Sequence, residues 1–213
     1  MNAQRALLKD RAYEQIKELI LNWTFTPGTF LSERRLAAQL GMSKTPVRSA
    51  LERLANEGFV TISPQQGVVV REFSVEEIVD LFDIRIALET FVVKSLANRI
   101  DEAYVEKLEE NLDGQLETTI NGDYERATVL DTDFHVLLCQ ALGNREILRT
   151  MVHLRDKLYR VVYRVLQYNR QRIATSYEEH RKIAGAIFTG DGETAARLVQ
   201  EHLEWGKQAL VTR

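Results

Sequence analysis

Apolar residues in the first third of the chain follow a helical spacing and then a strand spacing. Over residues 12–23 they recur every three or four positions, which is the pattern of an amphipathic helix. Two shorter helical patterns follow within residues 32–58, with Gly41 at the turn between them. Residues 59–63 and 67–71 are rich in β-branched side chains and flank a Pro-Gln-Gln turn, which is a hairpin signal. The order predicts a long helix, two short helices and a β-hairpin.

This order of elements is that of a winged helix-turn-helix. Ser32 can cap the second helix, and either Ser43 or Thr45 can cap the third. Lys44 and Arg48 are one helical turn apart, so both can follow one groove of a duplex. Hydroxyl groups and cations of this kind bind phosphates and base edges, and a glycine at the hairpin lets the backbone approach closely. The candidate DNA contacts are Arg34, Ser43, Lys44, Thr45, Arg48 and Gly67.

The rest of the chain has helical periodicity only. Ser74 and Glu77 have the spacing of a capping box, so a helix is expected directly after the hairpin. Breaks at glycine and asparagine separate six predicted helices, over residues 75–98, 102–120, 123–142, 145–169, 176–189 and 192–210. We therefore expect a mainly α protein with two domains. Residues 1–73 form the winged helix-turn-helix, and residues 74–213 form an all-α six-helix bundle.

Charge is divided unevenly between these two domains. Residues 1–73 carry 10 basic and 7 acidic side chains, whereas residues 74–213 carry 18 basic and 24 acidic ones. The net charge of −3 is therefore +3 in the first domain and −6 in the second. A basic first domain can bind nucleic acid although the second domain makes the whole chain acidic.

Two features bear on the compartment. Cys139 is the only cysteine, which excludes an intramolecular disulfide, and its apolar neighbours indicate a buried core position. No apolar run approaches the roughly 18 residues of a membrane span. We expect a cytoplasmic protein that does not contact a membrane.

Three of the four histidines have spacings that bring them together. Asp131 and His135 are four residues apart on one helix face. His180 and His202 each lie eleven residues from Asp191, the turn of a predicted helical hairpin, so they are expected side by side. Together the four form a ligand set for a divalent ion, Zn²⁺ or Ni²⁺. Two unrelated hydrogen-bonded pairs are the alternative.

The remaining histidine, His153, has no partner by spacing and is interpreted as structural. A divalent ion with four protein ligands keeps one or two positions open, where an anionic effector can bind. Arg155, Tyr159 and Tyr163 share one helix face, and Arg85 is a further cation that can face such a cavity. These four residues are candidates for binding the carboxylate of a small organic acid. A solvated arginine face with core tyrosines is the alternative.

The first domain closely resembles the winged helix of GntR-family bacterial transcription regulators. The resemblance covers nearly all of residues 9–73 and is carried by L-S-E-R-x-L-A-x-x-L-G-x-S-x-T-P-V-R-x-A-L-x-R-L, followed by E-G and the hairpin glycine. It implies that Arg34, Lys44 and Arg48 reach groove edges, that Ser43 and Thr45 hold phosphates, and that the wing lies over the minor groove. Lys44 departs from the arginine common in the family. A lysine cannot make the planar two-point contact to guanine that an arginine makes at this position.

The second domain resembles the FCD ligand-binding domain of the FadR-type branch of that family. The resemblance covers residues 77–207 and rests on R-I-A-L-E, L-D-T-D-F-H, L-G-N, E-H-R-K-I and G-D-x-x-x-A before His202. In many members an aspartate and three histidines bind a metal, and Asp131, His135, His180 and His202 match these positions. Six helices rather than seven is similar to the VanR-like subgroup.

These observations predict a homodimeric repressor that binds double-stranded operator DNA and responds to a small organic acid. Two alternatives stay open. A metal-dependent enzyme would need a general base, and no carboxylate is placed by spacing to act as one: Glu179 and Asp133 point away from the histidine faces. A constitutive DNA binder with a purely structural metal is the other.

Overall fold

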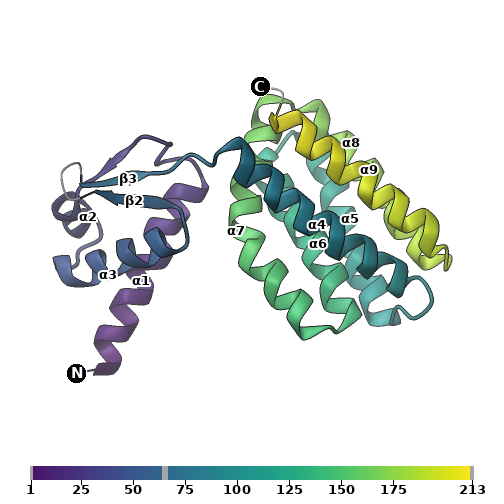
Figure 1. Ribbon diagram of the computed structural model, residues 1–213, viewed down its shortest axis with the longest axis horizontal. Coiled ribbons are helices and arrows are strands. Elements are labelled where there is room, and N and C mark those ends of the chain that lie inside the picture. The colour runs from purple at the N-terminus through teal and green to yellow at the C-terminus, as the bar shows by residue number, and fades with distance from the viewer. Residues whose placement is uncertain (1, 64–66, 212–213) are drawn as a thin grey trace. The chain divides into compact units, whose positions relative to one another are not determined.

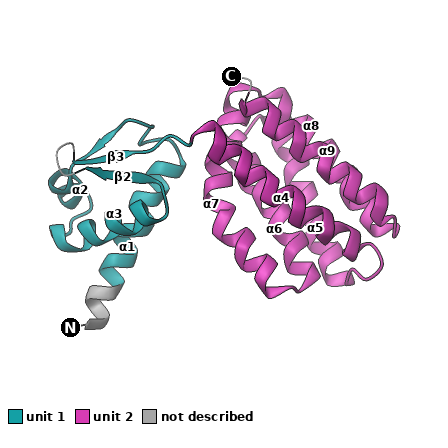
Figure 2. Ribbon diagram, viewed as in Figure 1, with its two compact units in different colours: residues 1–73 teal, residues 74–213 magenta. Residues whose placement is uncertain are grey.

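The chain is folded into two compact units. The computed structural model describes residues 2–63 and 67–211 (Figure 1). The first unit ends at Phe73 and the second begins at Ser74 (Figure 2), and this boundary coincides with the one expected from the sequence. Among the described residues, no helix is both long and apolar enough to cross a bilayer.

The first unit packs three helices against a small sheet. Its helices are α1 (Asn2–Leu21), α2 (Glu33–Gln39) and α3 (Lys44–Asn56), and its strands are β1 (Phe30–Leu31), β2 (Val60–Ser63) and β3 (Gly67–Val70). The strands pair antiparallel in the order β1-β3-β2. The predicted winged helix-turn-helix is confirmed, with one more strand than the sequence pattern shows. A two-residue strand such as β1 is too short to display an alternation.

The core of this unit takes apolar residues from every helix and strand. Ile16, Leu36 and Leu54 from the three helices pack in one cluster with Leu31 and Val68 from the sheet. The apolar stripe of α3 therefore faces the core, and its opposite face is left exposed.

The two short helices begin differently. The Oγ of Ser32 accepts a hydrogen bond from the backbone nitrogen of Arg35 at 3.4 Å, so Ser32 caps α2 as predicted. Ser43 occupies the N-cap position of α3, yet its side chain makes no capping hydrogen bond, and Thr45 lies within the first turn of the helix. The predicted side-chain cap of α3 is therefore wrong for both residues, and the exposed hydroxyl of Ser43 is not used by the helix.

Gly67 is required by the fold itself. It begins β3 with a φ of +79°, and a Cβ at this position would lie 2.5 Å from Cε2 of Phe30 on β1. Only glycine meets both demands without strain. Its expected approach to DNA stays a prediction, and the turn predicted at Pro64, Gln65 and Gln66 lies outside the described residues.

The second unit is a bundle of helices. Those described are α4 (Val75–Leu96), α5 (Glu102–Asn121), α6 (Tyr124–Leu142), α7 (Arg145–Tyr168), α8 (Gln171–Phe188) and α9 (Gly192–Val211). The predicted all-α bundle is confirmed. So is the capping box at its start: the Oγ of Ser74 accepts from the Glu77 backbone nitrogen at 3.2 Å, and Glu77 Oε2 accepts from the Ser74 backbone nitrogen at 2.9 Å.

In the second unit, one predicted helix start is wrong. Helix α8 begins at Gln171, five residues before the expected start at residue 176. Its first turns bury Arg172 and Ser176 as well as Ile173, so polar side chains occupy the inward positions. An apolar periodicity cannot be seen where the inward residues are polar.

Helix α6 lies in the middle of the bundle and packs against α4, α5, α7 and α8. Helices α4 and α9 also pack closely: a Cβ on Gly206 of α9 would lie 2.8 Å from Cε1 of Phe82 on α4. Residues from α4, α6, α8 and α9 are thereby brought around one interior region.

Candidate metal centre and nucleic-acid interface

The candidate DNA contacts at the start of α2 and α3 are on the surface. Arg34, Ser43, Lys44, Thr45 and Arg48 are all exposed, as a surface that meets a duplex requires. Gly67 is half-buried at the start of β3. The helix caps and the apolar stripe of α3 fix which side chains point outward, so the arrangement follows from the local sequence.

Arg48 has a partner that the sequence does not reveal. Its Nε donates to Oε1 of Glu33 at 3.0 Å and its Nη2 donates to Oε2 at 2.9 Å. This two-point hydrogen bond lowers the pKa of Glu33. Glu33 precedes Arg48 by 15 residues and belongs to the neighbouring helix, so no helical spacing connects them. The candidate DNA-binding surface therefore carries a carboxylate bonded to one of its arginines.

Three buried histidines converge inside the second unit. His135 on α6, His180 on α8 and His202 on α9 each offer a ring nitrogen within 4.8 Å of the other two. The Nε2 atoms of His180 and His202 are 3.3 Å apart, so the two lie side by side. Oδ1 of Asp131 is 3.8 Å from Nε2 of His180. The four residues selected by spacing therefore meet in one place.

Each of these rings is held through its other nitrogen. The Nδ1 atom of His135 lies 2.5 Å from Oε2 of Glu89, and that of His202 lies 2.6 Å from Oε2 of Glu179. For His180 the partner of Nδ1 is Oε1 of Gln115, at 2.9 Å. Carboxylate and amide oxygens can only accept, so each Nδ1 carries the proton and each Nε2 presents a lone pair toward the centre.

The side chains that accept hydrogen bonds from the three histidines are held in place by further hydrogen bonds. Arg85 Nε donates to Oε1 of Glu89 at 2.7 Å, and Arg172 donates from both terminal nitrogens to Glu179, at 2.8 and 2.5 Å. Gln115 donates to Oδ1 of Asn111 at 2.7 Å. Sequence reasoning missed all of these residues as ring partners, because they come from other helices or from far along the chain. The sequence spacing argues against Glu179 as a general base. In the structure its carboxylate accepts a hydrogen bond from His202 and orients that ring.

The electrostatics keep His180 and His202 neutral and the carboxylate partners ionised. Burial, followed by the neighbouring histidines, lowers the pKa of His180 well below its usual value, and burial is also the main cause of the lowered pKa of His202. Burial alone would raise the pKa of Glu179, but hydrogen bonds from His202 and Arg172 outweigh it and lower the pKa to about 2. At Glu89 the charge of Arg85 and the hydrogen bonds from His135 and Arg85 likewise outweigh burial, and the pKa is about 2.

The donor set fits a divalent metal ion. The Nε2 of His135 is buried and has no hydrogen-bond partner among the described residues. With both Nδ1 atoms protonated, the Nε2 atoms of His180 and His202 face each other with lone pairs, an arrangement that a cation between them would stabilise. Imidazole nitrogens whose other N–H is donated to a carboxylate or carbonyl are the usual ligands of Zn²⁺ and similar ions. Asp131 adds an oxygen donor beside them.

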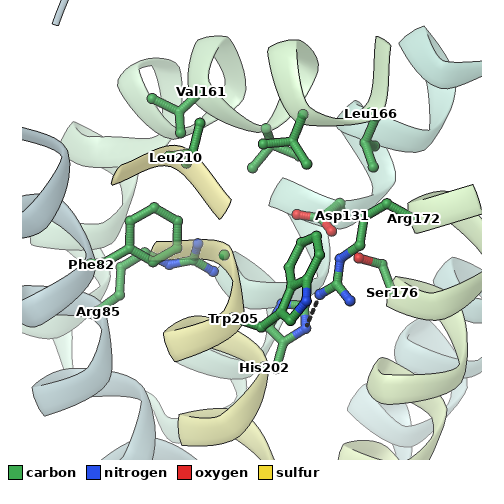
Figure 3. Close-up of a pocket in the computed structure, with 13 residues that line it drawn as sticks. Phe82, Arg85, Asp131, Val161, Leu166, Arg172, Ser176, His202, Trp205 and Leu210 are labelled. Carbon is green, nitrogen blue, oxygen red and sulfur yellow. Dashed lines mark hydrogen bonds between the residues drawn. The ribbon is translucent and has the colours of Figure 1, made fainter. Parts of the chain in front are cut away.

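A cavity opens beside the cluster (Figure 3). The space between its walls, part of which is open to solvent, is about 380 Å³, and the walls come from α4, α6, α7, α8 and α9. The lining residues are Phe82, Arg85, Asp131, Val161, Val162, Val165, Leu166, Arg172, Ser176, His202, Trp205, Gly206 and Leu210. A second hollow of about 190 Å³ shares Asp131, Leu166 and Ser176 with it.

Only one of the four predicted effector residues lines this cavity. Arg85 does, and it is buried. Arg155 instead pairs with Asp133 at 2.5 Å, where both side chains are partly exposed. Tyr163 is buried against Tyr159, at a ring distance of 6.0 Å, and neither tyrosine lines the cavity. For these three residues the geometry follows the alternative of a solvated arginine and packed tyrosines.

Cys139 and His153 have no part in the cluster. Cys139 is fully buried, as expected, and burial raises the pKa of its thiol far above the usual value. His153 is exposed on α7, away from the cluster.

Comparison with known proteins identifies the two units. Residues 8–70 match the bacterial regulatory proteins of the gntR family, and residues 80–204 match the FCD domain. The chain belongs to the GntR family of bacterial transcription regulators. Members bind DNA through the helix-turn-helix, and the family and the named relatives below are regulators, not enzymes. The metalloenzyme alternative is thereby set aside.

Two curated relatives show the same extent of similarity. An uncharacterized HTH-type transcriptional regulator in an unstable DNA locus of Streptomyces ambofaciens is 31% identical over 191 residues, covering 90% of this chain and 80% of that protein. The HTH-type transcriptional repressor RspR of Escherichia coli is 28% identical over 197 residues, covering 92% and 86%. In structure, a GntR regulator from Rhodococcus sp. RHA1 matches with a TM-score of 0.84 at 24% identity, covering 96% of this chain and 97% of that one. That likeness concerns the fold.

Proposed function

We propose that this GntR-family regulator is a homodimeric, metabolite-responsive repressor with a metal-assisted site for a small organic acid. The observation that carries the proposal is the convergence of three imidazoles and Asp131 beside a cavity in the FCD domain. Asp131, His135, His180 and His202 would hold a divalent ion, Zn²⁺ or Ni²⁺. Such an ion supplies a Lewis-acidic position for an effector carboxylate. The six described helices of this domain are in keeping with the VanR-like subgroup.

DNA recognition is assigned to the first unit. Arg34, Lys44 and Arg48 would reach base edges and phosphates, and Ser43 and Thr45 would donate to phosphates. Their exposure, and the hydroxyl of Ser43 left unused by its helix, support these roles. Two copies would read the half-sites of a short pseudo-palindromic operator, since a two-fold dimer matches two-fold DNA.

Helix α4 provides a route from the effector site to the DNA-binding unit. It begins at the capping box of Ser74, directly after the wing, and carries Arg85 and Glu89 into the cluster. An acid that engages Arg85 would bias the position of this helix. By linkage, the acid and the operator must then change each other's affinity by the same factor.

A metal titration tests the centre of this proposal. We expect the protein stripped by chelator to bind one Zn²⁺ or Ni²⁺ per chain, with a rise in melting temperature set by the ratio of metal concentration to its dissociation constant. His202→Ala should weaken metal binding by at least tenfold, because it removes a ligand. His153→Ala is the matched control, since this histidine is exposed, and it should bind metal as the wild type does. Equal metal affinity in both variants would refute the assignment.

The same samples separate the regulatory from the purely structural role of a metal. If the metal is regulatory, organic acids should weaken operator binding only in the metal-loaded protein. If it is structural, chelation should lower the melting temperature, and acids should leave operator affinity unchanged at any metal occupancy.

A further inference from the structure

The cavity beside the histidine cluster is mostly apolar. Helix α7 contributes Val161, Val162, Val165 and Leu166, and further apolar walls come from Phe82, Trp205 and Leu210. In Figure 3 Val161, Leu166 and Leu210 face the hollow from one side, whereas Asp131, Arg172 and His202 lie on another side. Any molecule in the cavity must therefore place most of its surface against hydrocarbon and its polar end near the cluster.

One cation of the lining keeps both of its terminal nitrogens without a hydrogen bond to a described residue. Arg85 is 3% exposed, and its one hydrogen bond within the described residues runs from Nε to Glu89. Its two terminal nitrogens keep their donors for a ligand. Arg172 differs, because both of its terminal nitrogens are bonded to Glu179 and its guanidinium lies over the ring of Trp205 at 3.7 Å. The anionic end of a ligand is thus directed to Arg85, next to the lone pairs of the histidines.

We infer that the cavity selects a carboxylate with an unsubstituted hydrocarbon body and rejects hydroxylated acids. A hydroxyl group on the ligand body would meet valine and leucine side chains and lose its hydrogen bonds to water without replacement. Ser176 carries the one hydroxyl group among the lining residues, and Asp131, Arg172 and His202 lie on the other side from the valine and leucine walls, so those walls offer a polyol no hydrogen bonds. A hydrocarbon body instead gains on the order of fourfold in affinity for each buried methylene. This inference rests on the proposed function in one respect, that the FCD domain binds an effector beside the cluster.

A series of acids tests the inference on the full-length, metal-loaded protein. Calorimetry with butyrate, hexanoate and gluconate compares acids of different chain length and, for the last two, of equal carbon number. Hexanoate should bind more tightly than butyrate by about sixteenfold, with a negative heat-capacity change that gluconate lacks. Gluconate binding as tightly as hexanoate, no dependence on chain length, or no binding by any of the acids would each overturn the inference.

Two variants test where the hydrocarbon body and the carboxylate of the bound acid lie in the cavity. Val161→Asn places an amide in the apolar wall and should weaken hexanoate binding by about tenfold, whereas Val152→Asn, at an exposed position of the same helix, should not. Arg85→Gln should weaken hexanoate by tenfold or more but leave neutral hexan-1-ol unchanged, which shows that the variant is folded. Arg181→Gln on the exposed side of α8 is its control. Hexanoate affinity unchanged in both Val161→Asn and Arg85→Gln would refute the site.

Operator binding, measured in parallel, distinguishes this inference from the proposed function. If hexanoate binds with the expected preferences but does not release DNA, the ligand class stands and the regulatory proposal fails. If gluconate binds tightly and releases DNA, the regulatory proposal stands and the inferred ligand class fails.

Discussion

Arg48 lies on the candidate DNA-binding surface, yet its side chain is bonded to a carboxylate of the same unit. Its guanidinium is bonded at two points to Glu33, although 63% of the side chain is exposed. A pair this exposed contributes little to stability, because solvent screens the attraction between its charges. Its effect on function is different, because the carboxylate both orients Arg48 and offsets its charge against a polyanion.

Glu33→Gln should therefore change DNA binding more than folding. We expect higher affinity for non-specific DNA and less discrimination between operator and competitor, because Arg48 becomes available to any phosphate. The slope of log affinity against log salt should steepen by about one. Fluorescence anisotropy over a salt range measures both effects. Glu14→Gln, at an exposed position of α1, is the control and should keep the wild-type slope. Weaker binding to all DNA would show instead that Glu33 holds Arg48 in its binding position.

Residues of the candidate metal centre could be predicted from the sequence where helix geometry links them. The four-residue spacing of Asp131 and His135, and the equal distance of His180 and His202 from their turn, are local rules. Glu89 is 46 residues from His135, and Gln115 is 65 residues from His180. No periodicity encodes such partners, since they depend on which helices pack against which.

At the scale of elements, two serines at helix N-caps allow an effect on folding stability to be distinguished from an effect on DNA binding. Ser74 takes part in a capping box at the start of α4, whereas the side chain of Ser43 makes no capping bond at the start of α3. We expect Ser74→Ala to lower the free energy of unfolding of the second unit by about 1 kcal/mol. Ser43→Ala should lower the free energy of unfolding by only a few tenths of that amount, yet it should weaken operator binding. Urea denaturation and operator titration of both variants check this contrast, and equal losses of stability would contradict it.

The existence and order of the longer elements follow from apolar periodicity, and the exceptions have physical causes. Strand β1 is two residues long and is formed only because β3 pairs with it. The first turns of α8 bury Arg172, which is held by Glu179 from the same helix and by the ring of Trp205. In both cases a tertiary partner, absent from any local pattern, decides the structure.

At the scale of the whole molecule, the proposed homodimer needs a surface where two copies can meet. Helix α4 exposes Ile84 and Phe91, which are 42% and 54% exposed and seven residues apart on one face of the helix. Large apolar side chains in such a row are suited to an interface between identical subunits, because a two-fold axis sets the same patch against itself. This helix also carries Arg85 and Glu89, so an interface here would connect the effector cavity to the spacing of two DNA-binding units.

Phe91→Glu is therefore expected to weaken the homodimer by tenfold or more, because it replaces apolar contact with two like charges facing each other across the axis. Sedimentation equilibrium measures this change. Affinity for a two-half-site operator should fall with it, whereas affinity for a single half-site should not, since each recognition surface is intact. Ile120→Glu is the matched control: Ile120 is 83% exposed on α5, and its substitution should leave the association unchanged. A wild-type protein that is monomeric at micromolar concentration, or a control variant that dissociates equally, would place the dimer interface elsewhere or remove it.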